Sequence, residues 1–211
     1  MIKILIADDH TIVRKGIIQL IEGAQDIKVT AEAKNAAEVL HLITRQDFDV
    51  IVLDISMPGR SGLEVLKELK SIKPEIPILI LSMFPEEQYA IRVMRSGASG
   101  YLTKESAPEE LIKALRTIAG GKKYIHPSLA EQLADHFDQS VDKPLTEKLS
   151  DREYETMIKI ATGKSLTKIA EELSISVKTV STYRRRILNK LNLNSNVEIT
   201  QLVIKNNLKT G

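Results

Sequence analysis

Five short apolar runs alternate with helix-length amphipathic stretches in the first 126 residues, and this alternation constrains the fold more than any other feature. The runs are 2–7, 28–33, 50–53, 78–81 and 100–103, and the stretches between and after them are 11–21, 36–45, 63–70, 87–96 and 111–119. Continuous rather than alternating apolar runs are typical of parallel strands covered by helices on both faces. We therefore expect a doubly wound α/β domain with a five-stranded parallel sheet.

Several classes of protein are excluded by simple counts. The 211 residues include no cysteine, so disulfides, thiolate zinc sites and cysteine nucleophiles are absent. The longest apolar runs are strand-sized, far below the roughly 20 residues that span a bilayer. The N-terminus leads into a strand pattern and then acids, without the features of a signal peptide. We expect a cytoplasmic protein with no membrane span.

Polar side chains follow four of the five expected strands. Asp8 and Asp9 follow the first, Asp54 the third, Ser82 the fourth and Lys104 the fifth. Ligands of such sheets bind outside the carboxyl ends of the strands, so these side chains should line one site. For any one position, a polar residue that simply ends a strand is the simpler explanation. That explanation is weaker when polar residues follow four of the five strands.

Three carboxylates at one site repel each other unless a cation lies among them, and Mg²⁺ is the usual choice where phosphate oxygens complete its ligands. Asp54 ends the central strand and is the best placed to attack phosphorus and form an aspartyl phosphate, with a lysine neutralising the transferred group. The chain contains no glycine-rich nucleotide-binding motif, so the phosphoryl group must come from another molecule. His10 has no partner at ligand spacing and is interpreted as a loop side chain.

These residues resemble the receiver domain of bacterial two-component response regulators. The likeness rests on Asp8-Asp9, residues 52–59 with Gly62, Ser82 and residues 97–104, and it covers the first 120 residues. It implies a flavodoxin-like sheet of order 2-1-3-4-5.

The likeness also implies a role for each matching residue. Asp54 would accept the phosphoryl group, while Asp9, Asp54, the backbone carbonyl of Ser56 and, through water, Asp8 would hold Mg²⁺. Lys104 would pair with the phosphoryl oxygens, Ser82 would donate its hydroxyl to them on activation, and Tyr101 would change rotamer as Ser82 moves. For Tyr101, a half-buried strand aromatic without a switching role is the alternative.

Charge is unevenly distributed along the chain, which has a net charge of +2. Residues 156–211 carry 10 basic and 3 acidic side chains, whereas residues 127–155 carry 3 and 8. Condensed positive charge favours a nucleic-acid partner, although a solvated helix face is also possible. We expect a receiver at 1–121, an acidic linker with one short helix at 122–146, and a DNA-binding domain at 147–211.

The last domain has the pattern of a helix-turn-helix. A capping box at Ser150 and Glu153 begins one helix, and helices at 166–173 and 177–191 flank a three-residue turn, with a further helix after Ser195. In helix 177–191 the positions of Val180, Ile187 and Leu191 form the core seam. The expected DNA contacts lie on the same helix: Lys178, Thr179, Ser181, Thr182, Arg184 and Arg185. Of these, Arg184 lies nearest the seam and is expected to reach a phosphate or an internal acid.

Residues 149–153, 168–173 and 176–191 resemble the LuxR-type DNA-binding domain, and the two domains together resemble the NarL/FixJ subfamily. The likeness implies a sensor histidine kinase as phosphodonor, promoter half-sites in double-stranded DNA, a homodimer on activation and contact with the transcription machinery. Ser181 and Tyr183 depart from the family pattern, which affects the target sequence.

Two other functions are considered. A Mg²⁺-dependent phosphatase would need an acid two residues beyond Asp54, where this chain has Ser56. We therefore expect no turnover enzyme. The other is a DNA-binding protein whose receiver is only a dimerisation scaffold, independent of phosphorylation.

Overall fold

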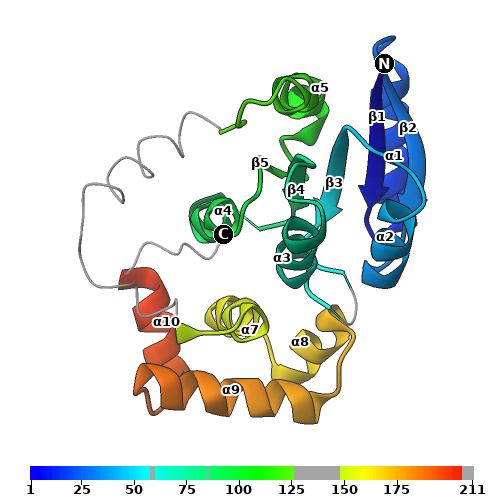
Figure 1. The fold of residues 1–211 in the computed structure, drawn as a ribbon. Coiled ribbons are helices and arrows are strands. Elements are labelled where there is room, and N and C mark those ends of the chain that lie inside the picture. The colour runs from blue at the N-terminus through cyan, green and yellow to red at the C-terminus, as the bar shows by residue number, and fades with distance from the viewer. Residues whose placement is uncertain (58–59, 85, 126–147, 206–211) are drawn as a thin grey trace. The chain divides into compact units, whose positions relative to one another are not determined.

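The computed structural model describes residues 1–57, 60–84, 86–125 and 148–205, and it divides the chain into two compact units (Figure 1). The division falls between residues 125 and 148. The short helix expected in the linker lies outside the described residues. Each unit is described separately below.

The first unit contains a five-stranded sheet in which every neighbouring pair is parallel. The strands are β1 (Ile2–Ala7), β2 (Ile27–Ala33), β3 (Val50–Asp54), β4 (Ile78–Ser82) and β5 (Gly100–Thr103). Their order across the sheet is β2-β1-β3-β4-β5. Both the expected fold class and the expected strand order are confirmed.

Helices cover both faces of this sheet (Figure 1). They are α1 (Thr11–Glu22), α2 (Ala36–Ile43), α3 (Gly62–Ile72), α4 (Glu86–Arg95) and α5 (Ala107–Ala119). Helices α1 and α5 pack on one face, over a core of residues such as Ile6, Val52 and Leu102. Helices α2, α3 and α4 cover the other face. The central strands are buried on both sides, which explains their unbroken apolar sequences.

The carboxyl ends of four strands meet at one edge of the sheet. Ala7 of β1 pairs with Leu53 of β3, and Ser82 of β4 pairs with Thr103 of β5. The loops that follow these strands therefore begin side by side, and they carry the polar residues singled out in the sequence.

The start of α5 is not a capping box, although Ser106 and Glu109 have the spacing of one in the sequence. Ser106 has helical backbone angles, with φ −81° and ψ −13°, and makes no side-chain capping bond. Its hydroxyl instead contacts the Thr103 hydroxyl at 3.0 Å. Because the side chain is held by the end of β5, it ties the helix to the strand that precedes it.

The chain returns to the sheet after α5. The Tyr124 amide donates to the Ser99 carbonyl at 2.8 Å, and Tyr124 forms an isolated bridge with Gly100. The Tyr124 hydroxyl lies 2.9 Å from Glu110 Oε2 of α5. Tyr124 therefore packs on the first unit, although it belongs to the stretch expected to act as a linker.

The second unit contains four helices among its described residues: α7 (Asp151–Ala161), α8 (Leu166–Leu173), α9 (Val177–Leu191) and α10 (Asn196–Lys205). The expected capping box at Ser150 and Glu153 is present at the start of α7. Ser165 and Ser176 cap α8 and α9 by accepting hydrogen bonds from the amides of Lys168 and Thr179. Val180, Ile187 and Leu191 are buried, as the seam predicted.

The turn between α8 and α9 is sharp because Ser174 adopts a left-handed conformation with φ 53°. This residue ends α8, and two residues later Ser176 caps α9. The pair of helices and their turn form the expected helix-turn-helix. No helix within the described ranges is long and apolar enough to cross a membrane.

Candidate functional sites

The loops at the carboxyl edge of the sheet bring three carboxylates and one ammonium group together. Lys104 Nζ, after β5, lies 2.9 Å from Asp54 Oδ2 and 2.7 Å from Asp8 Oδ2. Asp9 joins them, since one ligand atom each from Asp8, Asp9, His10 and Asp54 lies within 4.8 Å of the others. We call these four residues and Lys104 the acidic pocket. Residues from three loops, 44 to 96 positions apart in the chain, thus lie close together.

Burial and charge oppose each other in this pocket. Burial raises the pKa of the Asp54 carboxyl, and the nearby Asp8 carboxylate adds to that effect, while Lys104 counteracts it. Burial alone would lower the pKa of Lys104, but the two carboxylates outweigh it and raise that pKa. The lysine is therefore held as a cation directly beside Asp54.

The backbone around Asp54 is fixed by close packing. The Ser56 amide donates to Asp54 Oδ1 at 3.1 Å, and the Gly62 amide donates to the Ile55 carbonyl at 2.8 Å. A Cβ atom on Gly62 would lie 2.1 Å from the Asp54 carbonyl oxygen, so only glycine fits there. The Ser56 carbonyl, expected as a metal ligand, belongs to this same loop.

Arg14 is a supporting residue that the sequence reasoning missed. Its side chain is buried in α1, where Nη1 donates to the Asp8 carbonyl at 2.8 Å and Nε to Glu32 Oε2 at 2.7 Å. The signal was present in the sequence, because Arg14 occupies the core-facing positions of α1 with Ile17 and Ile21. An arginine on such a seam must have internal acceptors.

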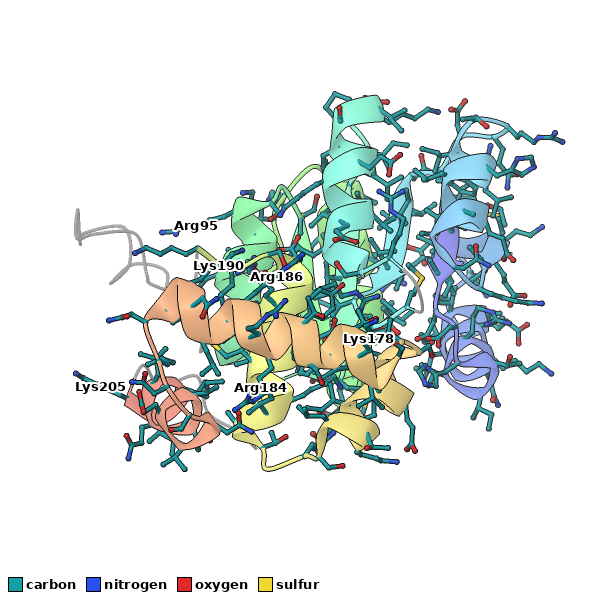
Figure 2. The ribbon with its side chains drawn as sticks, turned by 90° about the horizontal axis from the view of Figure 1, so that it is seen from below. Arg95, Lys178, Arg184, Arg186, Lys190 and Lys205 are labelled. Atoms are coloured by element: carbon teal, nitrogen blue, oxygen red, sulfur yellow. The ribbon has the colours of Figure 1, made fainter. Side chains whose placement is uncertain are left out.

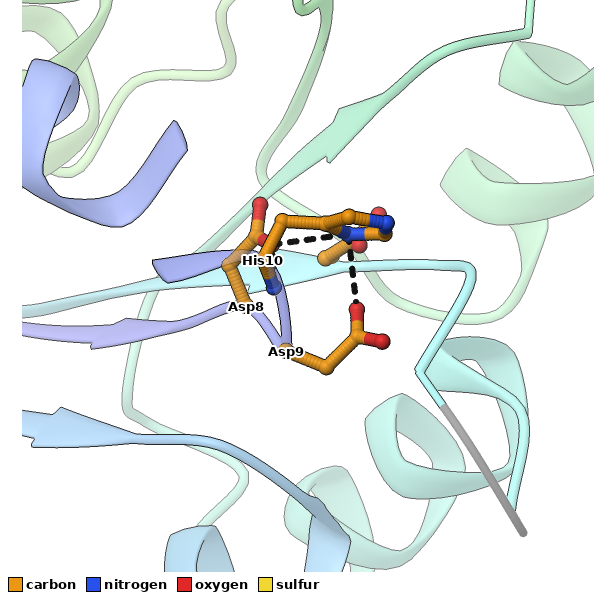
Figure 3. A group of neighbouring side chains, drawn as sticks. Asp8, Asp9 and His10 are labelled. Atoms are coloured by element: carbon orange, nitrogen blue, oxygen red, sulfur yellow. Dashed lines mark hydrogen bonds and ion pairs between the residues drawn. The ribbon is translucent and has the colours of Figure 1, made fainter. Parts of the chain in front are cut away.

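His10 lies closer to the carboxylates than its interpretation as a loop side chain suggested. Its Nδ1 atom is 2.9 Å from Asp9 Oδ1 and 3.4 Å from Asp8 Oδ1 (Figure 3). Its own amide donates to Asp8 Oδ1 at 2.8 Å. The imidazole remains 61% exposed, so it lies at the outer side of the acidic pocket.

Ser82 and Tyr101 are connected through the backbone of one residue. Ser82 Oγ accepts a hydrogen bond from the Phe84 amide at 3.1 Å, and the Tyr101 hydroxyl donates to the Phe84 carbonyl at 2.7 Å. The Phe84 ring stacks on Tyr89 of α4, with 4.6 Å between the ring centroids. Tyr101 is fully buried rather than half-buried. A movement of Ser82 would therefore displace Phe84 and, through it, alter the contacts of Tyr101 and α4.

Helix α9 carries the expected DNA contacts in the second unit. Lys178, Ser181 and Arg185 are exposed, while Thr179, Thr182 and Arg184 are partly buried. Figure 2 shows Lys178 near one end of the helix and Lys190 near the other. Residues 178–190 include five basic side chains and no acid. The helix thus presents a basic, hydrogen-bonding face opposite its buried seam.

Two of these basic residues make contacts inside the unit. Arg184 Nε donates to Asn196 Oδ1 of α10 at 2.6 Å, so its partner within the unit is an amide, whereas a phosphate or an internal acid was expected. Lys190 Nζ donates to Glu153 Oε2 at 2.6 Å, which joins the C-terminal end of α9 to the capping box of α7. The two contacts fix the orientation of α9 between its neighbours.

Comparison with protein families matches both units. Residues 4–116 match the response regulator receiver domain, and residues 147–203 match the bacterial regulatory proteins of the luxR family. The receiver match includes the whole acidic pocket. The second match includes the helix-turn-helix and all but the last two residues of α10.

Similar proteins align with this chain over nearly its full length. The response regulator UvrY of Escherichia coli K12 is 36% identical over 210 residues, which cover 99% of this chain and 96% of UvrY. The oxygen regulatory protein NreC of Staphylococcus epidermidis is 38% identical over 214 residues, covering 98% of each chain.

A solved structure extends this likeness to three dimensions. It is RcsB from Salmonella enterica serovar Typhimurium bound to promoter rprA in the presence of the phosphomimetic BeF3-, with 26% identity and a TM-score of 0.64. The match covers 97% of this chain and 99% of that one. The chain described here therefore belongs to the NarL/FixJ family of response regulators, with a receiver domain followed by a LuxR-type DNA-binding domain.

Proposed function

We propose that this chain is a cytoplasmic transcription regulator that is switched by phosphorylation of Asp54. The observation that carries the proposal is the position of Lys104, whose ammonium group lies 2.9 Å from Asp54 Oδ2 and 2.7 Å from Asp8 Oδ2. A cation in contact with a buried carboxylate is suited to neutralise a phosphoryl group that is placed on that carboxylate.

The chemical step is a transfer between two carriers. One Asp54 carboxylate oxygen forms a new bond to phosphorus while the bond from phosphorus to its donor breaks. The donor is a phosphohistidine nitrogen of a sensor histidine kinase, or the acyl oxygen of a small phosphodonor, and it keeps the electron pair of the broken bond. Lys104 then contacts the phosphoryl oxygens, and the Ser82 hydroxyl turns towards them.

The acidic pocket also fits Mg²⁺. Its donors are carboxylate oxygens, which this hard cation prefers, and Asp9 Oδ1 is buried without a hydrogen bond from any described residue. Asp9, Asp54 and the Ser56 carbonyl would hold the ion directly and Asp8 through water. When bound, Mg²⁺ supplies charge neutralisation for the phosphoryl oxygens.

The effect of phosphorylation at Asp54 passes to the rest of the receiver through Ser82, Phe84 and Tyr101. Ser82 and Tyr101 share the Phe84 backbone, so an altered Ser82 hydroxyl changes the setting of Tyr101 and of the β4–α4 loop. A common switching device is an added phosphoryl charge that shifts the equilibrium between two conformations of such a segment. The output is homodimerisation and DNA binding, followed by contact with the transcription machinery.

The DNA-binding part acts through α9. Its Lys178, Ser181 and Arg185 side chains are exposed and suited to base edges or phosphates of a promoter half-site, with Thr179, Thr182 and Arg184 at the border of that face. A single unit of this size offers few phosphate contacts, so two copies on two half-sites favour tight binding. The RcsB structure named above, which is bound to a promoter, supports this assignment by similarity.

The two alternatives are less well supported. A phosphatase would need an acid at the position of Ser56, so we propose that the chain accepts a phosphoryl group without being a turnover enzyme. A receiver used only as a dimerisation scaffold would have no need of the contacts among Lys104, Asp8 and Asp54.

The test is the intact mass of the full chain after incubation with Mg²⁺ and acetyl phosphate, followed by light scattering. Wild type should gain one phosphoryl group and shift from monomer to dimer, and Asp54→Asn should do neither. Lys104→Ala should separate the two effects, with mass gain but no dimer. Phosphoryl uptake by Asp54→Asn would overturn the assignment of the acceptor, and uptake by wild type without a change in association would favour the scaffold.

A further inference from the structure

We infer that Val177, the first residue of α9, contacts the C5-methyl group of a thymine in the DNA half-site and thereby sets part of the target sequence. The inference rests on the proposed function, because it concerns a residue of the same DNA-binding helix. It adds an apolar contact to a face that is otherwise assigned through charged and hydrogen-bonding side chains.

The first observation is that Val177 is an exposed apolar residue. Its exposed fraction is 42%, whereas Val180 and Ile187 of the same helix are 0% exposed. Val177 therefore lies outside the core seam of α9. Valine favours a helix less than alanine does, so the stability of α9 does not require it. A ligand that offers apolar surface at this position would gain free energy by covering the side chain.

The second observation is that Val177 begins a row of side chains that contains two of the expected DNA contacts. Ser181 and Arg185 follow it at intervals of four residues, which places all three on the same face of the helix. All three are exposed. The row is about 12 Å long, since an α-helix rises about 1.5 Å per residue, and this equals about three to four base-pair steps of about 3.4 Å. Val177 would therefore reach a different base pair from Arg185.

The third observation is that the first turn of α9 contains no acidic residue. The first turns of α7 and α10 do contain acids, as is favourable at the positive end of a helix. An acid in α9 would repel the phosphates of DNA. Lys178 instead follows Val177 at this end of the helix (Figure 2). Because a recognition helix contacts base edges with its N-terminal residues, Val177 occupies a position suited to a base contact.

The chemistry of valine selects the base. Thymine is the base that presents a methyl group in the major groove, beside the acceptors and donors that all four bases present there. Valine has no polar side-chain atom, so it gains nothing from those acceptors and donors, but it can pack against the methyl group. The burial of one methyl group corresponds to a gain of about three- to fivefold in affinity.

The test removes the methyl group from the DNA and the valine from the protein in turn. The probe is a duplex selected from a random pool by the full chain in the presence of Mg²⁺ and acetyl phosphate. Each thymine of its half-site is replaced by deoxyuridine, which lacks only the C5-methyl group. We call the affinity for the thymine duplex divided by that for the uracil duplex the methyl ratio, and fluorescence anisotropy at fixed salt measures both affinities.

Wild type should give a methyl ratio of about three to five at one position of the half-site. Val177→Ala should bind the thymine duplex more weakly by a similar factor, and its methyl ratio at that position should be about one. Because Val177 is exposed and alanine is a good helix former, this variant should fold as wild type does.

Two further variants make the result specific to Val177. Val197→Ala removes a valine of α10 that is 66% exposed, and it should keep the methyl ratio of wild type. Thr182→Ser removes the methyl group of Thr182 and retains the hydroxyl, which donates to the Lys178 carbonyl at 3.0 Å. It should keep the ratio as well.

Three outcomes would overturn the inference and leave DNA binding by α9 in place. They are a half-site without thymine, a methyl ratio of one at every thymine in wild type, and a wild-type methyl ratio in Val177→Ala. Loss of the ratio in Thr182→Ser alone would assign the thymine to Thr182 and so belongs to the third outcome. A full chain that enriches no duplex from the pool would overturn the proposed function together with this inference, so the two failures can be distinguished.

Discussion

The hydroxyl of Tyr101 donates a hydrogen bond of 2.7 Å to the backbone carbonyl of Phe84, across the gap between β5 and the loop that follows β4. The amide of the same Phe84 donates to Ser82 Oγ at 3.1 Å. The backbone of Phe84 is therefore hydrogen-bonded to both side chains. The first prediction concerns this connection.

Replacing Tyr101 with Phe should loosen the loop after β4. The change removes one buried hydrogen bond, which is worth about 1 kcal/mol in the free energy of unfolding. The exchange of the Phe84 amide with deuterium, followed by NMR, should become faster.

Tyr124→Phe is the matched control for this variant. It removes the hydroxyl that lies 2.9 Å from Glu110 Oε2 at a different place in the same unit. Its cost in stability should be similar, but exchange at Phe84 should stay at the wild-type rate. Unaltered exchange in Tyr101→Phe would show that the Tyr101 hydroxyl does not hold the loop.

Replacing Gly62 with Ala should distort the loop beneath Asp54. The added Cβ would lie 2.1 Å from the Asp54 carbonyl oxygen and 2.6 Å from the Ile55 Cα, and neither backbone atom can move easily. Overpacking of this kind costs on the order of 1–3 kcal/mol in stability, measured by urea unfolding. Phosphoryl uptake from acetyl phosphate should fall as well.

Gly16→Ala serves as the contrasting substitution. A Cβ on Gly16 in α1 would meet nothing within 4 Å, so alanine there should stabilise the chain by about 0.5–1 kcal/mol. The prediction for Gly62 is wrong if Gly62→Ala is as stable as the wild type or more stable.

Replacing Arg185 with Ala should weaken binding to specific DNA by about 1–3 kcal/mol, if a base edge is its partner. Binding to unrelated DNA of the same length should change little. Arg186→Ala removes the same charge from another side of α9 and should change both affinities by one factor. Fluorescence anisotropy at fixed salt measures the six constants, for wild type and both variants on the two DNAs. An equal loss on both DNAs for Arg185→Ala would assign this residue to a phosphate.

The Glu153 carboxyl should make the stability of the second unit depend on pH. Burial raises its pKa, but the hydrogen bonds from Lys190 and the Ser150 backbone lower it more, so the net pKa lies below the ordinary value of 4.5. A carboxyl whose pKa is lowered by folding stabilises the folded state at pH values above its ordinary pKa. This stabilisation is lost as the pH falls through the pKa of the folded state.

Glu153→Gln should therefore cost more stability at pH 7 than in acid. Urea unfolding of the full chain at pH 7 and near pH 3 measures the two differences. The control is Glu171→Gln, which removes the carboxylate that lies 3.4 Å from Lys168 Nζ in an exposed ion pair. It should have little effect on stability at either pH. A difference for Glu153→Gln that is the same at both pH values would contradict the assigned pKa direction.

The elements and the strand-end residues could be predicted because both depend on local pattern. The unbroken apolar runs fixed the strand positions to within one residue, and parallel strands necessarily bring Asp8, Asp54, Ser82 and Lys104 to one edge. The buried seam of α9 followed from its helical period alone.

Contacts between distant side chains could not be predicted in the same way. The sequence does not reveal that Arg184 meets Asn196, or that Lys190 meets Glu153, because the crossing of the helices sets these pairs. Ser106 shows the opposite error, since its sequence pattern matches a capping box but its hydroxyl binds Thr103. His10 directly follows Asp9, but the sequence does not show that its ring turns back towards that carboxylate.

The ion pair between Lys104 and Asp54 joins residues 50 positions apart and has a consequence for the order of biosynthesis. A ribosome completes β1 and β3 before it adds Lys104, so a nascent chain at that stage holds the acids without their cation. Docking β3 beside β1 would then bury like charges. The acidic end of the sheet should therefore fold only after β5 has been made. The pocket that accepts the phosphoryl group then forms only when the receiver has been synthesised completely.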